Sequence, residues 1–424
     1  MTQSAPDEVT AYPRRKIFVL SSLSLFTAGL SFALRGAVIA SVVAELAPGS
    51  AELAGSLLGT AFLGFGLTLL FASVVLERIG MGRTLLASAS CFIAGTLIAI
   101  SARGESAETA IRLGFGLSGL GWGFMEAAVN PLTAALYPEE KTHRLNVVHA
   151  WWPAGLILGT LIAVSASALE IGWRVQFAAV VLPALGCVAL FVGTPFPRTE
   201  RASLGVSMGE MFAEIARHPM FLLWWACMLL TAAAELAPNQ WFDFALTRSI
   251  GIRGAWIVIY VSAMMFVFRH FAGAIAHRVS NVGMLLGSSV LAVCGLWLLP
   301  LADSPVTGLL AATVWGLGVC FLWPTMLANV SERYPKGGEL FIGLMGVAGA
   351  LSIQYVLPVL GQITDRTKHT IAGGPEAFGA MEAASQVPIL QAANQAAFHT
   401  LAGWVGVLIA AFAAVAIAER RRAS

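Results

Sequence analysis

The sequence predicts an all-α membrane protein in which twelve transmembrane helices form two six-helix bundles. Hydrophobic residues make up 58% of the 424 residues and charged residues only 11%, whereas a soluble domain carries about 25% charged residues. Apolar runs of about 20 residues, the length of a helix that crosses a bilayer, fill the chain almost end to end. The runs are rich in Ala, Leu and Gly and lack the alternation of barrel strands, so we expect helices rather than a β-barrel.

Each predicted span is one such apolar run, and the few charged residues mostly lie between the runs. In chain order the spans cover residues 17–45, 53–76, 83–102, 108–136, 146–169, 173–194, 220–246, 255–277, 282–301, 305–331, 340–363 and 398–418. The chain therefore divides into a tail, a first bundle, a polar linker, a second bundle and a second tail, at 1–16, 17–194, 195–219, 220–418 and 419–424. We expect a short amphipathic helix in the linker around 208–217 and a long outer loop at 365–397.

The placement of basic residues predicts the orientation in the membrane. An even number of spans puts both termini on one side. The loops and tails of that side carry sixteen Lys and Arg residues, and the loops of the other side carry six. We therefore expect a multi-pass protein of the inner (plasma) membrane with both termini in the cytoplasm.

The composition also bears on other function classes. All five cysteines lie inside predicted spans without the spacing of a disulfide framework or a metal site, so we expect no metal and no cofactor. The basic residues are scattered among loops, so we expect no nucleic-acid partner. No loop carries a cluster of His, Asp or Cys residues, which argues against a membrane enzyme. The expected partners are the lipid bilayer and a small-molecule solute, and we expect a monomer.

The chain repeats its design after roughly 200 residues. The fourth and tenth predicted spans each contain a proline, Pro131 and Pro324, and each is followed by a Tyr-Pro pair that begins at Tyr137 or Tyr334. Six spans, a linker and six matching spans are typical of two bundles that rock against each other around a central pathway.

The loop after the second span carries a recognisable motif. Residues 76–83 read LERIGMGR and resemble the loop signature of the major facilitator superfamily, D-R-x-G-R-[RK], with Glu77 in place of Asp. Arg112 resembles the arginine that opens the family's fourth helix. The resemblance implies a secondary transporter, in which such a loop ties two helix ends together by a carboxylate–arginine contact when the protein faces outward. Glu77, Arg78 and Arg83 would then latch a cytoplasmic gate.

A narrower resemblance lies in the fourth and seventh spans. Residues 121–131, GWGFMEAAVNP, are similar to the fourth helix of the fucose–proton symporter group. Glu235 followed by Trp241 resembles the related bacterial glucose-type transporters. The fucose symporters carry an aspartate in the first helix, where this chain is apolar near Val43. The resemblance implies proton-coupled import of a sugar or a similar small polar solute.

Glu126 is the strongest candidate for coupling transport to protons. A charged side chain in mid-span raises the insertion free energy by about 2.5–3.5 kcal/mol, and burial favours the neutral form of a carboxyl group. Such a group can change its charge between the two facing states. Asn130 follows four residues later on the same helix face and could hold the carboxylate or a substrate hydroxyl. The alternative is a permanent ion pair between Glu126 and Arg35 that only assembles the fold.

Arg35 lies well inside the first span, where an always-charged guanidinium needs a partner. Glu126 is the first expected partner and Glu235 the second, and Arg35 would modulate proton coupling through these acids. If Arg35 instead faces the cavity, it could bind an anionic substrate directly.

Glu235 precedes Pro238, which should break the seventh span and free backbone groups near the membrane centre. Amides beside such a break can bind sugar hydroxyls, and an indole can stack on a sugar ring. We expect Glu235 to line the substrate site and to take part in proton coupling with Glu126 and Arg35. The alternative for Glu235 is an interhelical polar clamp, and His149 could equally be a structural group. The expected substrate-binding residues are Asn130, His149, Trp152, Asn239, Gln240, Trp241, Trp323 and Gln354.

Three other functions remain open from the residues alone. An exporter of drugs or metabolites would have a chiefly apolar cavity with one acidic centre. An organic-anion transporter would use Arg35. A membrane sensor would bind its solute without moving it.

Overall fold

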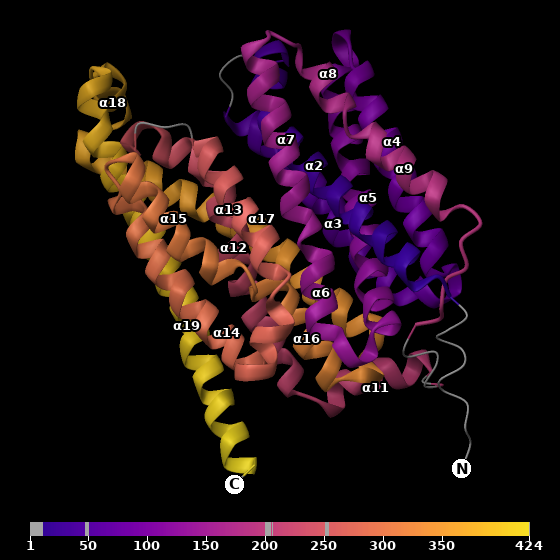
Figure 1. The fold of residues 1–424 in the computed structure, drawn as a ribbon. Coiled ribbons are helices and arrows are strands. Elements are labelled where there is room, and N and C mark those ends of the chain that lie inside the picture. Colours follow the sequence, from indigo (N-terminus) through magenta and orange to yellow (C-terminus); the bar gives the residue numbers. More distant parts are fainter. Residues whose placement is uncertain (1–11, 47–50, 200–204, 206, 251–253, 424) are drawn as a thin grey trace, which may run out of the picture.

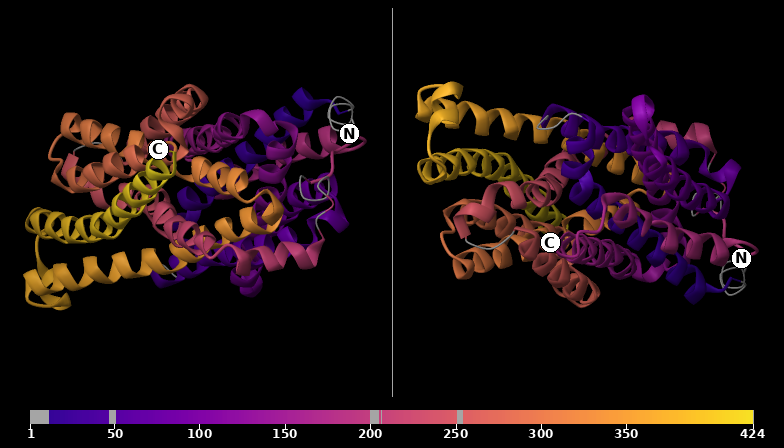
Figure 2. Two further views of the ribbon diagram at one scale, coloured as in Figure 1. Left: turned by 90° about the horizontal axis from the view of Figure 1, so that it is seen from below. Right: turned by 90° about the horizontal axis from the view of Figure 1, so that it is seen from above.

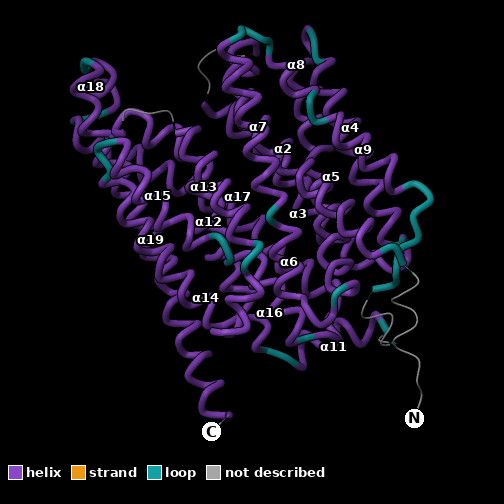
Figure 3. The backbone as a smooth tube through the Cα atoms, in the orientation of Figure 1, coloured by secondary structure: helices purple, strands orange, loops and turns teal. Residues whose placement is uncertain are grey.

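The computed structural model describes residues 12–46, 51–199, 205, 207–250 and 254–423. Within this part of the chain all regular structure is helical, with short connections (Figure 3). The first half contains α2 (Arg14–Leu46), α3 (Ala51–Ile79), α4 (Met81–Ser101), α5 (Ala107–Leu136), α6 (Lys141–His149), α7 (Trp151–Ala168), α8 (Trp173–Ala178) and α9 (Val181–Phe191). The linker contains α11 (Met208–Arg217), as predicted. The second half contains α12 (Met220–Ile250), α13 (Gly254–Arg269), α14 (Ala272–Leu298), α15 (Pro305–Val319), α16 (Leu322–Arg333), α17 (Gly338–Ala372), α18 (Pro375–Ala380) and α19 (Ala383–Ala423).

Ten helical segments of the described residues are long and apolar enough to cross a membrane. The two predicted spans outside this set have identifiable reasons. The helix α5 has 30 residues, but it is rich in glycine and carries Glu126 and Asn130, which lower its hydropathy. The helix α13 has only 16 residues. The predicted span at 255–277 consists of α13 and the first part of α14, and α14 is kinked at Ser280, where φ is 65°.

Buried apolar side chains form two separate clusters. One cluster lies within residues 17–191 and the other within residues 221–415, and Ala350 is the residue of the second half that joins the first cluster. Figure 1 shows the two groups of helices side by side, and Figure 2 shows them from either end. The start of α2 and the end of α19 lie at the same end of the molecule (Figure 1). Because each half has its own core, a relative movement of the halves would leave both cores intact.

The two halves touch at the end where α2 starts. Thr142 on α6 donates a hydrogen bond to Glu332 Oε1 on α16 (2.9 Å). Gly343 on α17 lies so close to α3 that a Cβ atom at 343 would stand 1.9 Å from Ser73 Oγ. Glycine at this position therefore permits the close approach of the two halves. Toward the other end the halves diverge (Figure 1), and two cavities lie between them.

Glycines also hold α5 close to α3. A Cβ atom at Gly119 would lie 2.0 Å from the carbonyl oxygen of Ala61, and one at Gly123 would lie 2.7 Å from that of Phe65. These contacts fix the position of α5 and thereby of Glu126, one turn further on.

The outer segment 365–397 is not the loop that the sequence predicts. The helix α17 continues to Ala372, and Gly373 (φ 84°) and Gly374 (φ 132°) then turn the chain. The helix α18 follows, and α19 begins at Ala383. Ala and Gln, both good helix formers, are frequent in this segment, and the Gly-Gly-Pro sequence at 373–375, which indicates a loop, accounts only for the turn before α18.

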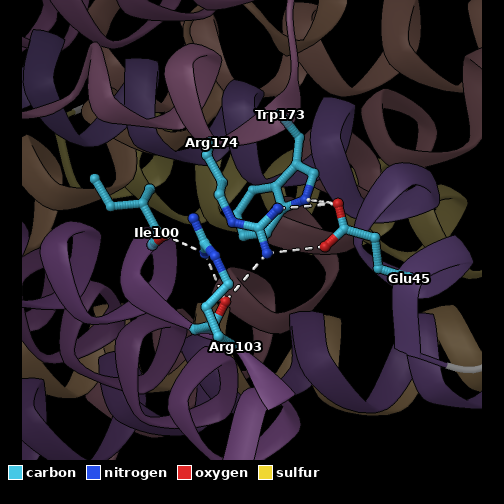
Figure 4. A network of polar contacts seen from close by, with 6 residues as sticks. Glu45, Ile100, Arg103, Trp173 and Arg174 are labelled. Carbon is cyan, nitrogen blue, oxygen red and sulfur yellow. Dashed lines mark hydrogen bonds and ion pairs between the residues drawn. The ribbon is translucent and has the colours of Figure 1, made fainter.

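A polar network joins α2, α4 and α8 at the end of the first half opposite the start of α2 (Figure 4). Glu45, near the end of α2, accepts hydrogen bonds from Trp173 Nε1 (2.8 Å) and from Nη1 and Nη2 of Arg174 (3.0 and 2.9 Å). Arg174 Nη2 also donates to the carbonyl oxygen of Ala102, which follows α4 (3.1 Å). The hydrogen bond from Arg174 holds the pKa of the Glu45 carboxyl below its usual range, although partial burial opposes this shift.

Candidate functional site

Two prolines of broken spans leave backbone carbonyls without a helical donor. Pro153 and Pro324 have no N–H group, so the carbonyls four residues earlier lose their helical hydrogen bond. These carbonyls belong to His149 and Cys320. Arg269 at the end of α13 binds both of them, because Nη1 donates to His149 O (2.8 Å) and Nε donates to Cys320 O (2.7 Å). The guanidinium thus joins the α6–α7 break of the first half to the α15–α16 break of the second.

The same guanidinium is the partner of Glu235. Arg269 Nη2 lies 2.9 Å from Glu235 Oε1, and the two residues are 1% and 5% exposed. The expected pairing of Arg35 with Glu235 is therefore wrong. The expected pairing of Arg35 with Glu126 is not found either, because Arg35 makes no ion pair among the described residues. The contacts of Glu235 match the alternative considered for it, a polar clamp between helices.

The sequence reasoning missed Arg269 as a member of the site. The sequence features that point to it are an arginine inside the predicted span 255–277 and two prolines, Pro153 and Pro324. Each proline frees the backbone carbonyl four residues before it. Each of these features can be found in the sequence, but the sequence does not show that the three segments converge.

Pro238 acts on α12 in the same way. It deprives the Ala234 carbonyl of its helical donor, and Trp315 Nε1 on α15 donates to that oxygen instead (3.0 Å). Asn239 Nδ2 donates to the carbonyl oxygen of Glu235 (2.8 Å). The backbone group freed by the predicted break is therefore bound by another side chain of the protein, and α12 runs through the proline.

A row of three hydrogen-bonded side chains lies in the first half. Asn130 Nδ2 donates to Glu126 Oε2 (2.6 Å), and His149 Nε2 lies 2.8 Å from Asn130 Oδ1. Because an amide oxygen only accepts, His149 must donate through Nε2. All three residues are buried, and no ion pair of Glu126 occurs within the described part of the chain. Of the two roles considered for Asn130, the structure shows the contact with the carboxylate.

The row also reaches the boundary between the halves. Its last member, His149, is the residue whose carbonyl oxygen accepts from Arg269. The row therefore ends at a residue that also takes part in the contact between α6 and α13.

Arg35 lines a cavity of about 370 Å³ between the halves. The residue is 3% exposed, and its Nη1 atom has no hydrogen-bond partner. Gln354 on α17, a predicted substrate-binding residue, lines the same cavity. The other walls are chiefly apolar and include Phe32 and Phe62.

A second cavity, of about 290 Å³, shares Phe32 and Gly36 with the first. Trp152 and Asn239, both predicted to bind substrate, line this cavity together with Thr160. The indole of Trp152 stacks on that of Trp122 with ring centroids 4.9 Å apart. The two cavities therefore bring aromatic side chains of the first half and amide side chains of the second half to one region.

Of the other predicted residues, Trp323 is not among those that line either cavity. Trp323 is buried against α17, where a Cβ atom at Gly349 would come within 2.4 Å of its ring. Gln240 and Trp241 lie outside the side chains that the structure describes.

The predicted gate residues lie at the α3–α4 connection. Glu77 accepts a hydrogen bond from Thr199 Oγ1 in the linker (2.7 Å), and Arg78 and Arg83 are exposed. Gly80 has a φ of 87°, which favours glycine there. The expected carboxylate–arginine contact is not found among the described residues, so the linker provides the partner of Glu77.

Comparison with known proteins identifies the family. The family model described as Major Facilitator Superfamily matches residues 20–353, more than half of the chain. The chain is a member of the major facilitator superfamily. This is a family of transporters, so the prediction of a multi-pass transporter rather than an enzyme is confirmed. A search of curated proteins finds no match to the sequence.

Solved structures of other superfamily members share the fold. The transporter FucP in its outward conformation is 15% identical, with a TM-score of 0.67 over 92% of this chain and 98% of that chain. The proton:xylose symporter XylE bound to 6-bromo-6-deoxy-D-glucose is 14% identical, with a TM-score of 0.68 over 92% and 95%. The human organic anion transporter MFSD10 (TETRAN) is 14% identical, with a TM-score of 0.66 over 94% and 99%. At these identities the likeness shows the superfamily fold alone.

Proposed function

We propose that this protein imports a small polar solute, with a sugar as the first candidate, and couples import to protons by alternating access. Superfamily membership supports transport, and similar folds include a proton:xylose symporter. The observation that carries proton coupling is Glu126, a buried carboxylate that is hydrogen-bonded to Asn130 and has no ion-pair partner among the described residues.

The proposed architecture has twelve spans in two six-helix bundles. The helix α5 and the segment formed by α13 and the start of α14 add two spans to the ten that are apolar enough on their own. The bias of Lys and Arg residues supports cytoplasmic termini and an inner-membrane location. With that orientation the halves touch on the cytoplasmic side and the two cavities lie toward the outside, so the state described is outward-facing.

The coupling step needs a group whose charge differs between the outward and inward states. A charged carboxylate in a closed, water-free centre is disfavoured, and a neutral one is tolerated. In the proposal Glu126 takes up a proton from the outside, the neutral centre then closes around the solute, and the proton leaves on the cytoplasmic side. The row from Asn130 to His149 supports this step, since it connects Glu126 to the Arg269 contact between the halves.

A proteoliposome assay tests the proposal. Adding a transported sugar outside should make the external medium more alkaline, because protons enter with the solute. Glu126→Gln keeps an acceptor for Asn130 but cannot titrate, so it should abolish the alkalinisation. Sugar-dependent alkalinisation that persists in this variant would remove Glu126 from the coupling role.

Counterflow of labelled sugar separates a transporter from a sensor. Vesicles preloaded with unlabelled sugar should accumulate the labelled form transiently, which a protein that only binds cannot do. A lack of counterflow over a panel of sugars that do bind would contradict transport of sugars.

A further inference from the structure

Arg35 differs from Arg269, the other buried arginine of the described residues, in having no acid beside it. It lies about two thirds of the way along α2 and is 3% exposed. Within the described residues it makes no ion pair and no hydrogen bond, and Nη1 is buried without a partner. Arg269 shows the contrast, because Glu235 and two backbone carbonyls bind its guanidinium.

Burying an arginine at this position raises the free energy of the folded protein unless an anion contacts the guanidinium. A guanidinium stays charged in proteins, and a charge at the centre of a span costs about 2.5–3.5 kcal/mol on insertion scales. Among the described residues the fold offers Arg35 no compensating carboxylate, so an anion bound in the cavity can supply the missing charge. The cavity that Arg35 lines provides the way in.

The shape of this cavity fits a small organic molecule. Its volume of about 370 Å³ lies within the range of ligand sites. Around Arg35 the backbone is bare at Gly36 and Gly59, where an added Cβ atom would meet nothing within 4 Å. Phe32 and Phe62 supply aromatic surface beside the charge.

We propose that Arg35 binds the carboxylate of the transported solute. The planar fork of a guanidinium matches a carboxylate through two parallel hydrogen bonds. The body of the solute then lies against Phe32 and Phe62, and Gln354 can bind a hydroxyl or carbonyl group. This inference rests on the proposed transport function and narrows its substrate class from small polar solutes to small organic monocarboxylates. Sugar acids and aromatic acids share that chemistry.

Matched pairs of probes test the carboxylate requirement on the full-length protein in lipid nanodiscs. Glucuronate is compared with glucose, and phenylacetate with 2-phenylethanol, by calorimetric titration and by the shift of the unfolding temperature. The acid of at least one pair should bind at least tenfold more tightly than its neutral partner. The pair that responds also tells a sugar acid from an aromatic acid.

Variants at position 35 test whether the preference for the acid depends on the Arg35 side chain. Arg35→Gln should abolish the preference for the acid, and Arg35→Lys should keep part of it because the charge remains. The control is Arg112→Gln, which removes an arginine paired with Glu108 on α5 and should leave the preference unchanged. Near-native unfolding temperatures of the variants show that they are folded.

Four results would overturn the assignment. They are equal binding of acids and neutral partners, an unchanged preference in Arg35→Gln, no binding of any probe, and displacement of the acids by chloride at equal concentration, which would mark a site for inorganic anions.

The counterflow assay distinguishes a failure of this assignment from a failure of the proposed transport function. If labelled glucose exchanges and the protein does not prefer the acids, the transport function is supported and the role of Arg35 is contradicted. If the acids bind through Arg35 but no solute exchanges, the site stands and transport falls.

Discussion

Two pairs of buried charged residues, one pair in each half of the molecule, differ in how their charges are compensated. In the second half Glu235 and Arg269 neutralise each other at 2.9 Å. In the first half Glu126 and Arg35 are equally buried, but neither makes an ion pair among the described residues. We infer that a paired charge stabilises the fold, whereas an unpaired charge can bind a proton or an anion.

The comparison has a thermodynamic side. Removing one partner of a buried ion pair leaves the other charge uncompensated and costs about 3–5 kcal/mol. Removing a buried charge that has no partner instead relieves its desolvation. Substitutions in the two halves should therefore change the free energy of unfolding in opposite directions.

The largest effect is expected at Arg269. Arg269→Met removes the partner of Glu235 and leaves the His149 and Cys320 carbonyls without donors, so the free energy of unfolding should fall by about 3–5 kcal/mol. Thermal unfolding of the purified protein measures this loss. The double variant with Glu235→Gln should lose less than the sum of the two single variants, and strict additivity would show that the pair is not coupled.

Pro153→Ala tests the contact between Arg269 and the His149 carbonyl at the boundary between the halves. The new N–H group at 153 competes with Arg269 for the His149 carbonyl and should weaken the outward-facing state by roughly 1 kcal/mol. A cysteine introduced at Gly59, in the cavity, should then react more slowly with an impermeant reagent added outside, by at most about fivefold, the factor that corresponds to roughly 1 kcal/mol. Pro388→Ala, on α19, is the control. Unchanged reactivity in Pro153→Ala would show that the Arg269 contact does not hold this state.

The unpaired charges of the first half should tolerate neutral substitution. Glu126→Gln and Arg35→Gln should leave the free energy of unfolding within about 1 kcal/mol of the wild type or raise it. The measurement is the thermal unfolding used for Arg269→Met. A loss as large as that of Arg269→Met in either variant would reveal a structural role and break the contrast between the halves.

The smallest effect is expected at Glu45, where the carboxylate is partly exposed. Glu45→Gln should destabilise the protein by roughly 1 kcal/mol or less. Because the pKa of Glu45 is lowered in the folded state, its contribution is present above the ordinary value of 4.5 and is lost as the pH falls through the folded pKa. Unfolding temperatures of wild type and variant should differ at pH 7 and converge on acidification. A difference that persists at low pH would assign the effect to packing.

The sequence predicts most of the fold, because apolar length and proline punctuation act locally. The helical spans and the linker helix at Met208–Arg217 follow from composition and periodicity. The prediction of a loop at 365–397 is wrong, because the length of this segment and its Gly-Gly-Pro sequence at 373–375 indicate a loop, whereas its alanines favour helices.

The candidate site is only half predictable from the sequence. The contact between Glu126 and Asn130 spans one helical turn, so spacing alone reveals it. The pairing of Glu235 with Arg269 joins α12 to α13, and nothing in the spacing separates it from the expected pairing with Arg35. The partner of a buried charge depends on which helices are neighbours, and this depends on the packing of the whole chain.

The most direct measurement of the central claim compares Glu126→Gln with Glu235→Gln in proteoliposomes under an imposed pH gradient. Glu126 is predicted to carry the proton, so Glu126→Gln should lose accumulation of the solute above equilibrium. Glu235→Gln should retain accumulation in whatever fraction of the protein stays folded. Uphill accumulation by Glu126→Gln, together with its loss in folded Glu235→Gln, would contradict the account.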